Sequence, residues 1–263
     1  MRLLLVGDIV GNPGRRAVGE MLEALRSRYD LQFVIVNGEN SAGGFGITKT
    51  VAKALFDAGA DVITLGNHAW AKRDSWDYIA NEPRILRPAN YPHGVIGRGW
   101  GVFDAADGSR VAVVNLLGRI FMNALDCPFR ASDSILAELS EQPHAVVIDF
   151  HAEATSEKIA LGYYLDGRTS AVIGTHTHIQ TSDERVLPGG TAYLTDVGMT
   201  GVVESVLGLD PQEAIKRFLT QMPGKIKPAE GDTTLQGVII DIDCDTRRAR
   251  GIQRISVRCV DEF

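Results

Sequence analysis

Five short apolar stretches of this chain each end in side chains that can bind a metal ion. They read LLLVGD, FVIVNGEN, DVITLGNH, AVVIDFH and SAVIGTHTH. Their polar ends supply Asp8, Glu39, Asn40, Asn67, His68, His151, His176 and His178. One apolar stretch before a polar residue is typical of any buried strand. Five indicate covered sheets whose carboxyl-terminal strand ends converge on one site, because ligands of such sheets bind beyond those ends.

The first part of the chain alternates strands and helices. Apolar runs predict strands at 2–7, 32–37 and 61–65, and helices at about 15–28 and 48–58 lie between them. Strands that are separated by single helices pair in parallel within one sheet. The front of the chain therefore has the pattern of an α/β protein.

The rest of the chain adds antiparallel strands. Apolar runs at 94–103 and 110–117 flank Asp107-Gly108, which is a strong hairpin signal. The later expected elements are helices at 130–141, 154–164 and 211–221, and strands at 145–150, 171–174, 185–187, 191–195, 235–242 and 249–258. We expect one α/β domain over residues 1–263, with a mixed sheet or two packed sheets.

Composition excludes several classes of protein. The chain has 27 basic and 33 acidic residues, a net charge of −6, and its densest basic stretch follows an acidic run, so a large nucleic acid is not expected as a partner. No apolar stretch is long enough for a membrane span, and Asp8 interrupts the start too early for a signal peptide. Three cysteines without a CxxC pair favour a reduced, cytoplasmic chain.

The polar residues differ in how specifically they point to chemistry. In a strand-like GTHTH segment, His176 and His178 would project to the same side and reach one small volume, where they could bind metal; the alternative is a pair on an exposed edge. His68 follows Asn67 directly and would face a ligand without binding metal, as a general acid must; the alternative is an incidental residue in a turn. Glu39 is a carboxylate that can bridge two ions.

The weaker signals have equally plain structural explanations. Asp8 could cap a turn, Glu153 is expected to begin a helix or to support a ligand, and Asp196 is expected to support a ligand or to be structural. The Gly-rich SAGGFGIT could offer N–H groups to a phosphate, although a flexible turn is favoured. We expect His93 and His144 to be structural.

The combined donor set predicts two metal ions. Seven residues offer oxygen or nitrogen and no sulfur: Asp8, Glu39, Asn40, Asn67, His151, His176 and His178. That set is too large for one tetrahedral zinc ion. It suits two ions that share a bridging carboxylate and lie about 3.5–4 Å apart.

These motifs resemble those of the calcineurin-like metallophosphoesterases from residue 4 to about 198. The motif order is kept, with GD, NGEN, GNH, a lone His and HTH, but Val10 replaces a usual His, Glu39 a usual Asp, and Ala69 a usual acid. These departures, with HAEATSEK and TDVGM, resemble the bacterial YmdB-like phosphodiesterases.

The resemblance implies a four-layer α/β/β/α sandwich with two packed mixed sheets, and hydrolysis of 2′,3′-cyclic AMP-like nucleotides. One ion would take Asp8, Glu39, Asn40 and His178, and the other Glu39, Asn67, His151 and His176. Iron is the preferred metal and manganese the alternative. A metal-bound hydroxide would attack phosphorus, and His68 would protonate the leaving oxygen.

Two other functions stay open, as does a homo-oligomeric state. A phosphomonoesterase, such as a nucleotidase or protein phosphatase, shares the chemistry at phosphorus but often needs extra cations. Arg119 is the one candidate at a strand end, and a structural or surface role is favoured for it. A metal-binding regulatory protein with weak catalysis would have no use for an unligated His68.

Overall fold

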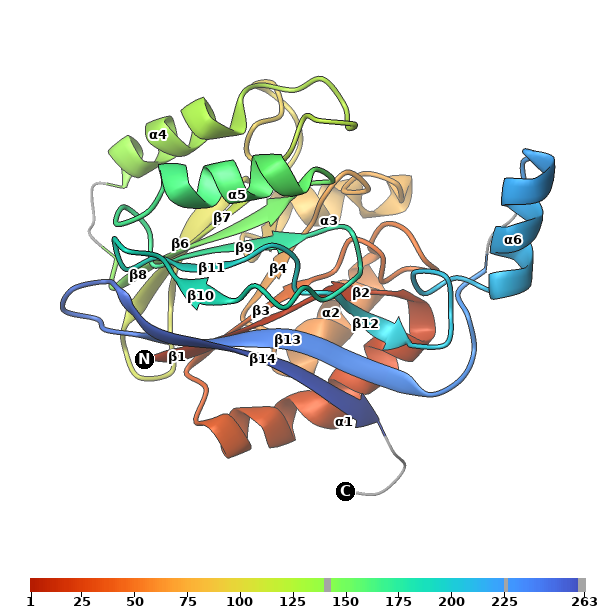
Figure 1. Cartoon of the computed structure of the whole chain (residues 1–263), viewed down its shortest axis with the longest axis horizontal. Coiled ribbons are helices and arrows are strands. Elements are labelled where there is room, and N and C mark those ends of the chain that lie inside the picture. The colour runs from red at the N-terminus through yellow and green to blue at the C-terminus, as the bar shows by residue number, and fades with distance from the viewer. Residues whose placement is uncertain (140–142, 225–226, 260–263) are drawn as a thin grey trace.

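Two β-sheets pack face to face between layers of helices (Figure 1). The computed structural model describes residues 1–139, 143–224 and 227–259. In the first sheet, β1 (Arg2–Val6), β3 (Phe33–Asn37), β4 (Val62–Thr64) and β5 (Ile85–Leu86) pair in parallel. On the other side of β1, the antiparallel β13 (Thr233–Ile242) pairs with β14 (Ala249–Cys259) and β12 (Met199–Val202), and β12 pairs with β2 (Asp8–Ile9).

The second sheet is also mixed. Its order is β10 (Arg185–Val186), β11 (Ala192–Leu194), β9 (Ala171–Thr175), β8 (Ala145–His151), β7 (Arg110–Leu117) and β6 (Trp100–Asp104). The four inner strands β11, β9, β8 and β7 run parallel, and the two outer strands are antiparallel to their neighbours. The predicted pair of mixed sheets is therefore confirmed.

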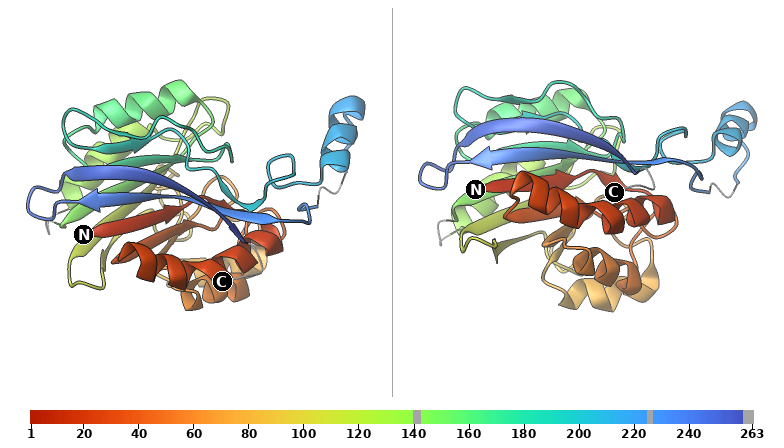
Figure 2. Two further views of the ribbon diagram at one scale, coloured as in Figure 1. Left: turned by 60° about the horizontal axis from the view of Figure 1, so that its bottom comes forward. Right: turned by 90° about the horizontal axis from the view of Figure 1, so that it is seen from below.

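Helices cover the outer face of each sheet. The first sheet carries α1 (Gly11–Tyr29), α2 (Lys49–Asp57) and α3 (Trp76–Asn81), which follows a 3-10 turn at Arg73–Ser75. The second carries α4 (Pro128–Glu138) and α5 (Thr155–Tyr164). The last helix, α6 (Pro211–Thr220), stands away from the two-sheet body (Figure 2).

Three apolar layers hold these elements together. Side chains alternate along β1, so that Leu4 and Val6 pack under α1, whereas Leu3 and Leu5 pack between the sheets. Val113 and Val147 meet Leu3 and Leu5 from the second sheet. Because both faces are covered, the central strands are apolar nearly throughout, as predicted. The four-layer α/β/β/α arrangement is confirmed.

The elements that the sequence did not predict are short. β2, β5, β12 and α3 are two to six residues long. α1 begins at Gly11 rather than at about Arg15, and strand β6 begins at Trp100 rather than at 94. The predicted end of the helix at 130–141 lies outside the described residues. No helix in the described ranges is both long and apolar enough to cross a membrane.

Candidate metal centre

The structure brings the predicted site residues to one edge of the two sheets. Strands β1, β3 and β4 are parallel and in register, so Asp8, Glu39 and Asn67 follow them at the same level. In the second sheet, His151 pairs with Thr175, the residue before His176. The site is therefore assembled from the carboxyl ends of strands in both sheets.

Three acceptor or ligand atoms surround the ring of His151. Its Nε2 lies 3.0 Å from Glu39 Oε1, 3.1 Å from Asn67 Oδ1 and 3.0 Å from His176 Nδ1. The N–H group at Nε2 can donate a good hydrogen bond to only one of these atoms. A shared cation would serve them all, and Glu39, His151 and His176 offer donor atoms within 4.8 Å of one another.

A second group of donors surrounds the amide of Asn40. Its Nδ2 lies 3.4 Å from Asp8 Oδ1, 3.3 Å from Glu39 Oε1 and 3.1 Å from His178 Nε2. The oxygen and nitrogen of an amide are interchangeable by rotation, so the amide oxygen can face the same group. Glu39 Oε1 takes part in both groups, which is the position of a bridging carboxylate.

His68 lies beside these groups rather than within them. Its Nδ1 is 2.9 Å from Asn40 Oδ1, and its backbone N–H donates to Glu39 Oε2 at 3.0 Å. The side chain of His68 is 42% exposed, whereas that of Glu39 is 1% exposed. An incoming ligand can therefore reach the imidazole of His68.

The prediction that His176 and His178 project from a strand is wrong. Strand β9 ends at Thr175, and both histidines have positive φ, 100° and 64°. The turn is held by Asp8 Oδ2, which accepts from the His176 N–H at 3.1 Å, and by Asp196 Oδ2, which accepts from the Thr177 N–H at 3.0 Å. The ring of His176 thus lies beside His151, and the ring of His178 lies beside Asn40.

The charges of the site favour a bound cation. Burial raises the pKa of Asp8. Burial would also raise the pKa of Glu39, but His151 and His68 lower it to about 2. Burial would lower the pKa of His151, but Glu39 raises it to about 9. The surroundings of His151 thus attract positive charge, which a proton supplies when no metal ion is bound. Metal ions compete with protons for such ligands.

The charge state of His176 also suits a metal centre. Burial and the charge of His151 lower the pKa of His176 to about 3, and the neutral imidazole is the form that binds metal.

Val10, which stands where the superfamily usually has His, is buried. A β-carbon on Gly208 would come within 2.7 Å of Val10 Cγ1, so this side of the site is packed. The side chains of Asn40 and His178 approach Asp8 Oδ1 instead, at 3.4 and 3.7 Å.

Buried polar residues that the sequence reasoning missed support His151. Its Nδ1 lies 3.0 Å from Thr175 Oγ1, which donates to Asp149 Oδ1 at 2.7 Å. Asn37 Nδ2 donates to Asp149 Oδ2 at 3.3 Å, from the other sheet. Burial raises the pKa of Asp149 to about 6. The available signal was an acid inside the apolar run VVIDF.

An ion pair beneath the histidine turn was also missed. Lys158 Nζ on α5 lies 2.7 Å from Asp196 Oδ2, and both side chains are at most 1% exposed. Asp196 also accepts from the backbone N–H groups of Thr177 and Gly198. The pair therefore links α5 to the turn that presents His176 and His178.

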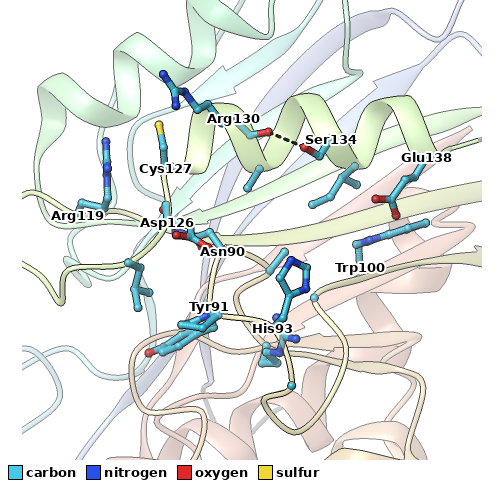
Figure 3. A pocket seen from close by; sticks show the side chains of 18 residues that line it. Asn90, Tyr91, His93, Trp100, Arg119, Asp126, Cys127, Arg130, Ser134 and Glu138 are labelled. Carbon is cyan, nitrogen blue, oxygen red and sulfur yellow. Dashed lines mark hydrogen bonds between the residues drawn. The ribbon is translucent and has the colours of Figure 1, made fainter.

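The remaining predicted residues lie outside the two donor groups. Glu153 Oε2 is 3.1 Å from His176 Nε2, as expected of a supporting acid. His144 Nδ1 accepts from the Arg110 N–H at 2.9 Å, a structural role. His93 and Arg119 line a cavity of about 740 Å³ between α4 and the segment around Tyr91 (Figure 3). Arg119 is exposed at that cavity.

This fold occurs in a known class of enzymes. The calcineurin-like phosphoesterase YfkN from Bacillus subtilis superposes with a TM-score of 0.60 at 10% identity, over 98% of this chain and 90% of that one. The chain belongs to the YmdB-like family, whose model, described as "YmdB-like protein", matches residues 4–255.

Two relatives are much more similar. A Bacillus subtilis protein named 2′,3′-cyclic-nucleotide 2′-phosphodiesterase is 51% identical over 257 residues, which cover 98% of this chain and 97% of that one. A Mycoplasma pneumoniae structure described as a novel phosphatase has a TM-score of 0.92 at 30% identity, over 98% of this chain and 93% of that one.

Gly66 is expected to be essential for the centre. A β-carbon there would overlap the carboxylate of Glu39 and the imidazole of His151. Gly66→Ala should lower the metal content of the purified protein and cost about 1–3 kcal/mol in unfolding free energy, the usual range for overpacking. Metal analysis and urea denaturation measure both. Gly19→Ala is the control, because nothing lies within 4 Å of that site. A Gly66→Ala protein with full metal content would contradict this role.

The Lys158–Asp196 pair is expected to contribute strongly to stability. Lys158→Met leaves a buried carboxylate unpaired, which typically costs about 3–5 kcal/mol. The matched control is Arg168→Ala, which breaks a half-exposed pair with Asp133 and should cost about 1 kcal/mol or less. Urea denaturation compares the two variants. Equal losses would show that the buried pair is no stronger than the surface pair.

Proposed function

We propose that this chain is a dinuclear-metal phosphodiesterase that hydrolyses 2′,3′-cyclic nucleotides. The observation that carries the proposal is the place of Glu39 Oε1, 3.0 Å from His151 Nε2 and 3.3 Å from Asn40 Nδ2. One carboxylate oxygen thus joins two donor groups, as a bridging ligand does. The name of the Bacillus subtilis relative supports the substrate class.

Seven residues would hold the ions. Asp8, Glu39, Asn40 and His178 form one group, and Glu39, Asn67, His151 and His176 form the other. Oxygen and imidazole donors without sulfur suit iron, our first choice, or manganese. When bound, such ions lower the pKa of water and neutralise charge on phosphoryl oxygens.

His68 would act on the leaving group. The Nδ1 atom of its exposed ring lies 2.9 Å from the side-chain amide of Asn40, so its position relative to the ligands is defined. From there it can give a proton to the departing alkoxide, which typically contributes about 10²–10⁴ in rate. We place the reaction in the cytoplasm, because Cys127, Cys244 and Cys259 carry free thiols.

A phosphomonoesterase is the second candidate. The Mycoplasma pneumoniae structure described as a phosphatase favours it. A monoester dianion would need an extra cation, and Arg119 is an exposed arginine after the end of β7. Its backbone N–H donates to Glu157 at 3.1 Å, which holds the backbone but leaves the guanidinium free to move. The choice between the two depends on substrate preference.

Substrate preference is tested with paired compounds. The metal-analysed protein should hydrolyse 2′,3′-cyclic AMP at least tenfold faster, in kcat/KM, than 3′,5′-cyclic AMP and than adenosine 2′- and 3′-monophosphates. Product chromatography gives all the rates under one condition. Faster hydrolysis of the monoesters would replace the proposed function with the second candidate.

The two assigned roles are separated by two variants. Glu39→Ala should lose at least one ion per chain and nearly all activity, because the shared ligand is removed. His68→Ala should keep its ions and lose about 10²–10⁴ in kcat on alkoxide leaving groups. Its loss should be much smaller on a p-nitrophenyl diester, whose leaving group needs no proton. Full metal content in Glu39→Ala would refute the bridging role, and unchanged turnover in His68→Ala would refute the acid.

A further inference from the structure

The ring of Phe45 is exposed beside the proposed catalytic histidine. Phe45 is 49% exposed, and its ring centroid lies 6.3 Å from that of His68 in an edge-on arrangement. A phenylalanine ring is normally buried, because it removes a large apolar area from water. Here the uncovered ring borders the space that a ligand of His68 would enter.

The loop that carries Phe45 holds the ring in place. Gly44 and Gly46 on either side have φ of 98° and 75°, which side chains rarely adopt. The Gly46 carbonyl accepts from the Ala42 N–H at 2.9 Å, and the Asn40 carbonyl accepts from the Gly44 N–H at 3.2 Å. The Gly-rich segment, for which the sequence favoured a flexible turn, is thus a loop closed by hydrogen bonds, one of them to the backbone of the proposed metal ligand Asn40.

The other side of the loop is packed against the segment that follows His68. A β-carbon on Gly46 would lie 2.9 Å from Lys72 Cγ, so no larger residue fits there. Lys72 Nζ lies 4.3 Å from the Phe45 ring centroid, a cation–π contact that covers part of the ring. Phe45 is therefore positioned relative to both Asn40 and His68, with half of its surface free.

We propose that Phe45 stacks on the base of the nucleotide and thereby selects the 2′-oxygen as the leaving group; this rests on the proposed function. The base nitrogen is three covalent bonds of about 1.5 Å from the 2′-oxygen and four from the 3′-oxygen. A base stacked on Phe45 would lie beside His68, whose ring centroid is 6.3 Å from that of Phe45, and the 2′-oxygen is the closer of the two oxygens to that base. Aromatic stacking accepts any base, because every base has a π-face.

The selected step follows from this placement. The oxygen of water bonds to phosphorus and one of its protons passes to solvent, the bond between phosphorus and the 2′-oxygen breaks, and the proton of His68 passes to that oxygen. His68 then regains a proton from solvent. The products are a 2′-hydroxyl group and a 3′-phosphate monoester. Without the stack, the ribose could also bind with its 3′-oxygen toward His68 and yield the 2′-phosphate.

The experiment compares two substrates and three variants of the full chain. The substrates are 2′,3′-cyclic AMP and 1,4-anhydroribitol 2,3-cyclic phosphate, which has no base. Phe45→Ala should raise KM about tenfold for the nucleotide, equivalent to about 1.4 kcal/mol, and should leave KM for the base-free substrate unchanged. Its product should also contain adenosine 2′-phosphate beside the 3′-phosphate. Phe45→Trp should restore both the KM for the nucleotide and the formation of the 3′-phosphate alone.

The controls separate stacking from damage to the fold. Phe218→Ala removes another exposed phenylalanine, 77% exposed on α6, and should behave as the unmodified chain. Equal KM changes on both substrates, or an unchanged KM with only 3′-phosphate formed by Phe45→Ala, would overturn the stacking role. If the unmodified chain hydrolyses neither substrate, the proposed function fails, and the stacking role fails with it.

Discussion

Two carboxylates buried at the junction of the sheets impose the strongest constraint on this molecule. Asp8 and Glu39 are 0% and 1% exposed. Burying such charges costs several kcal/mol each unless positive charge lies close by. In the described part of the chain their ion-pair partners are histidines, which can exchange a proton for a metal ion. The same crowding explains why Gly66 has no side chain.

The centre also joins the two halves of the fold. Asp8, Glu39 and Asn67 come from the first sheet, whereas His151 and His176 follow strands of the second. The apolar layer between the sheets and the bond from Asn37 to Asp149 keep these ends in register. Ions bound by both groups would therefore strengthen the same packing that positions their ligands.

The residues proposed for recognition and for catalysis lie on the same two loops. Asn40 and Phe45 lie on one loop, and His68 and Lys72 lie on the other, in contact across Gly46. Substitutions of the exposed Phe45 ring would therefore alter the proposed nucleotide binding without touching a buried ligand. Loops that carry function on a rigid scaffold are a general arrangement.

Most of the fold could be predicted from the chain itself, because strands covered on both faces must be apolar and helices between them show their own period. The polar residues at the strand ends could be named for the same reason. The short elements could not be predicted, because two to six residues are too few to show a period. The turn at His176 and His178 could not be predicted either, since its backbone is held by hydrogen bonds to the distant Asp8 and Asp196. The residues alone thus named the donors that we propose for the site. The packing of the two sheets decided which donors lie around Glu39. It also left His68 exposed and placed Phe45 beside it. Only the tertiary structure could decide these contacts, because they join segments that are far apart in the chain.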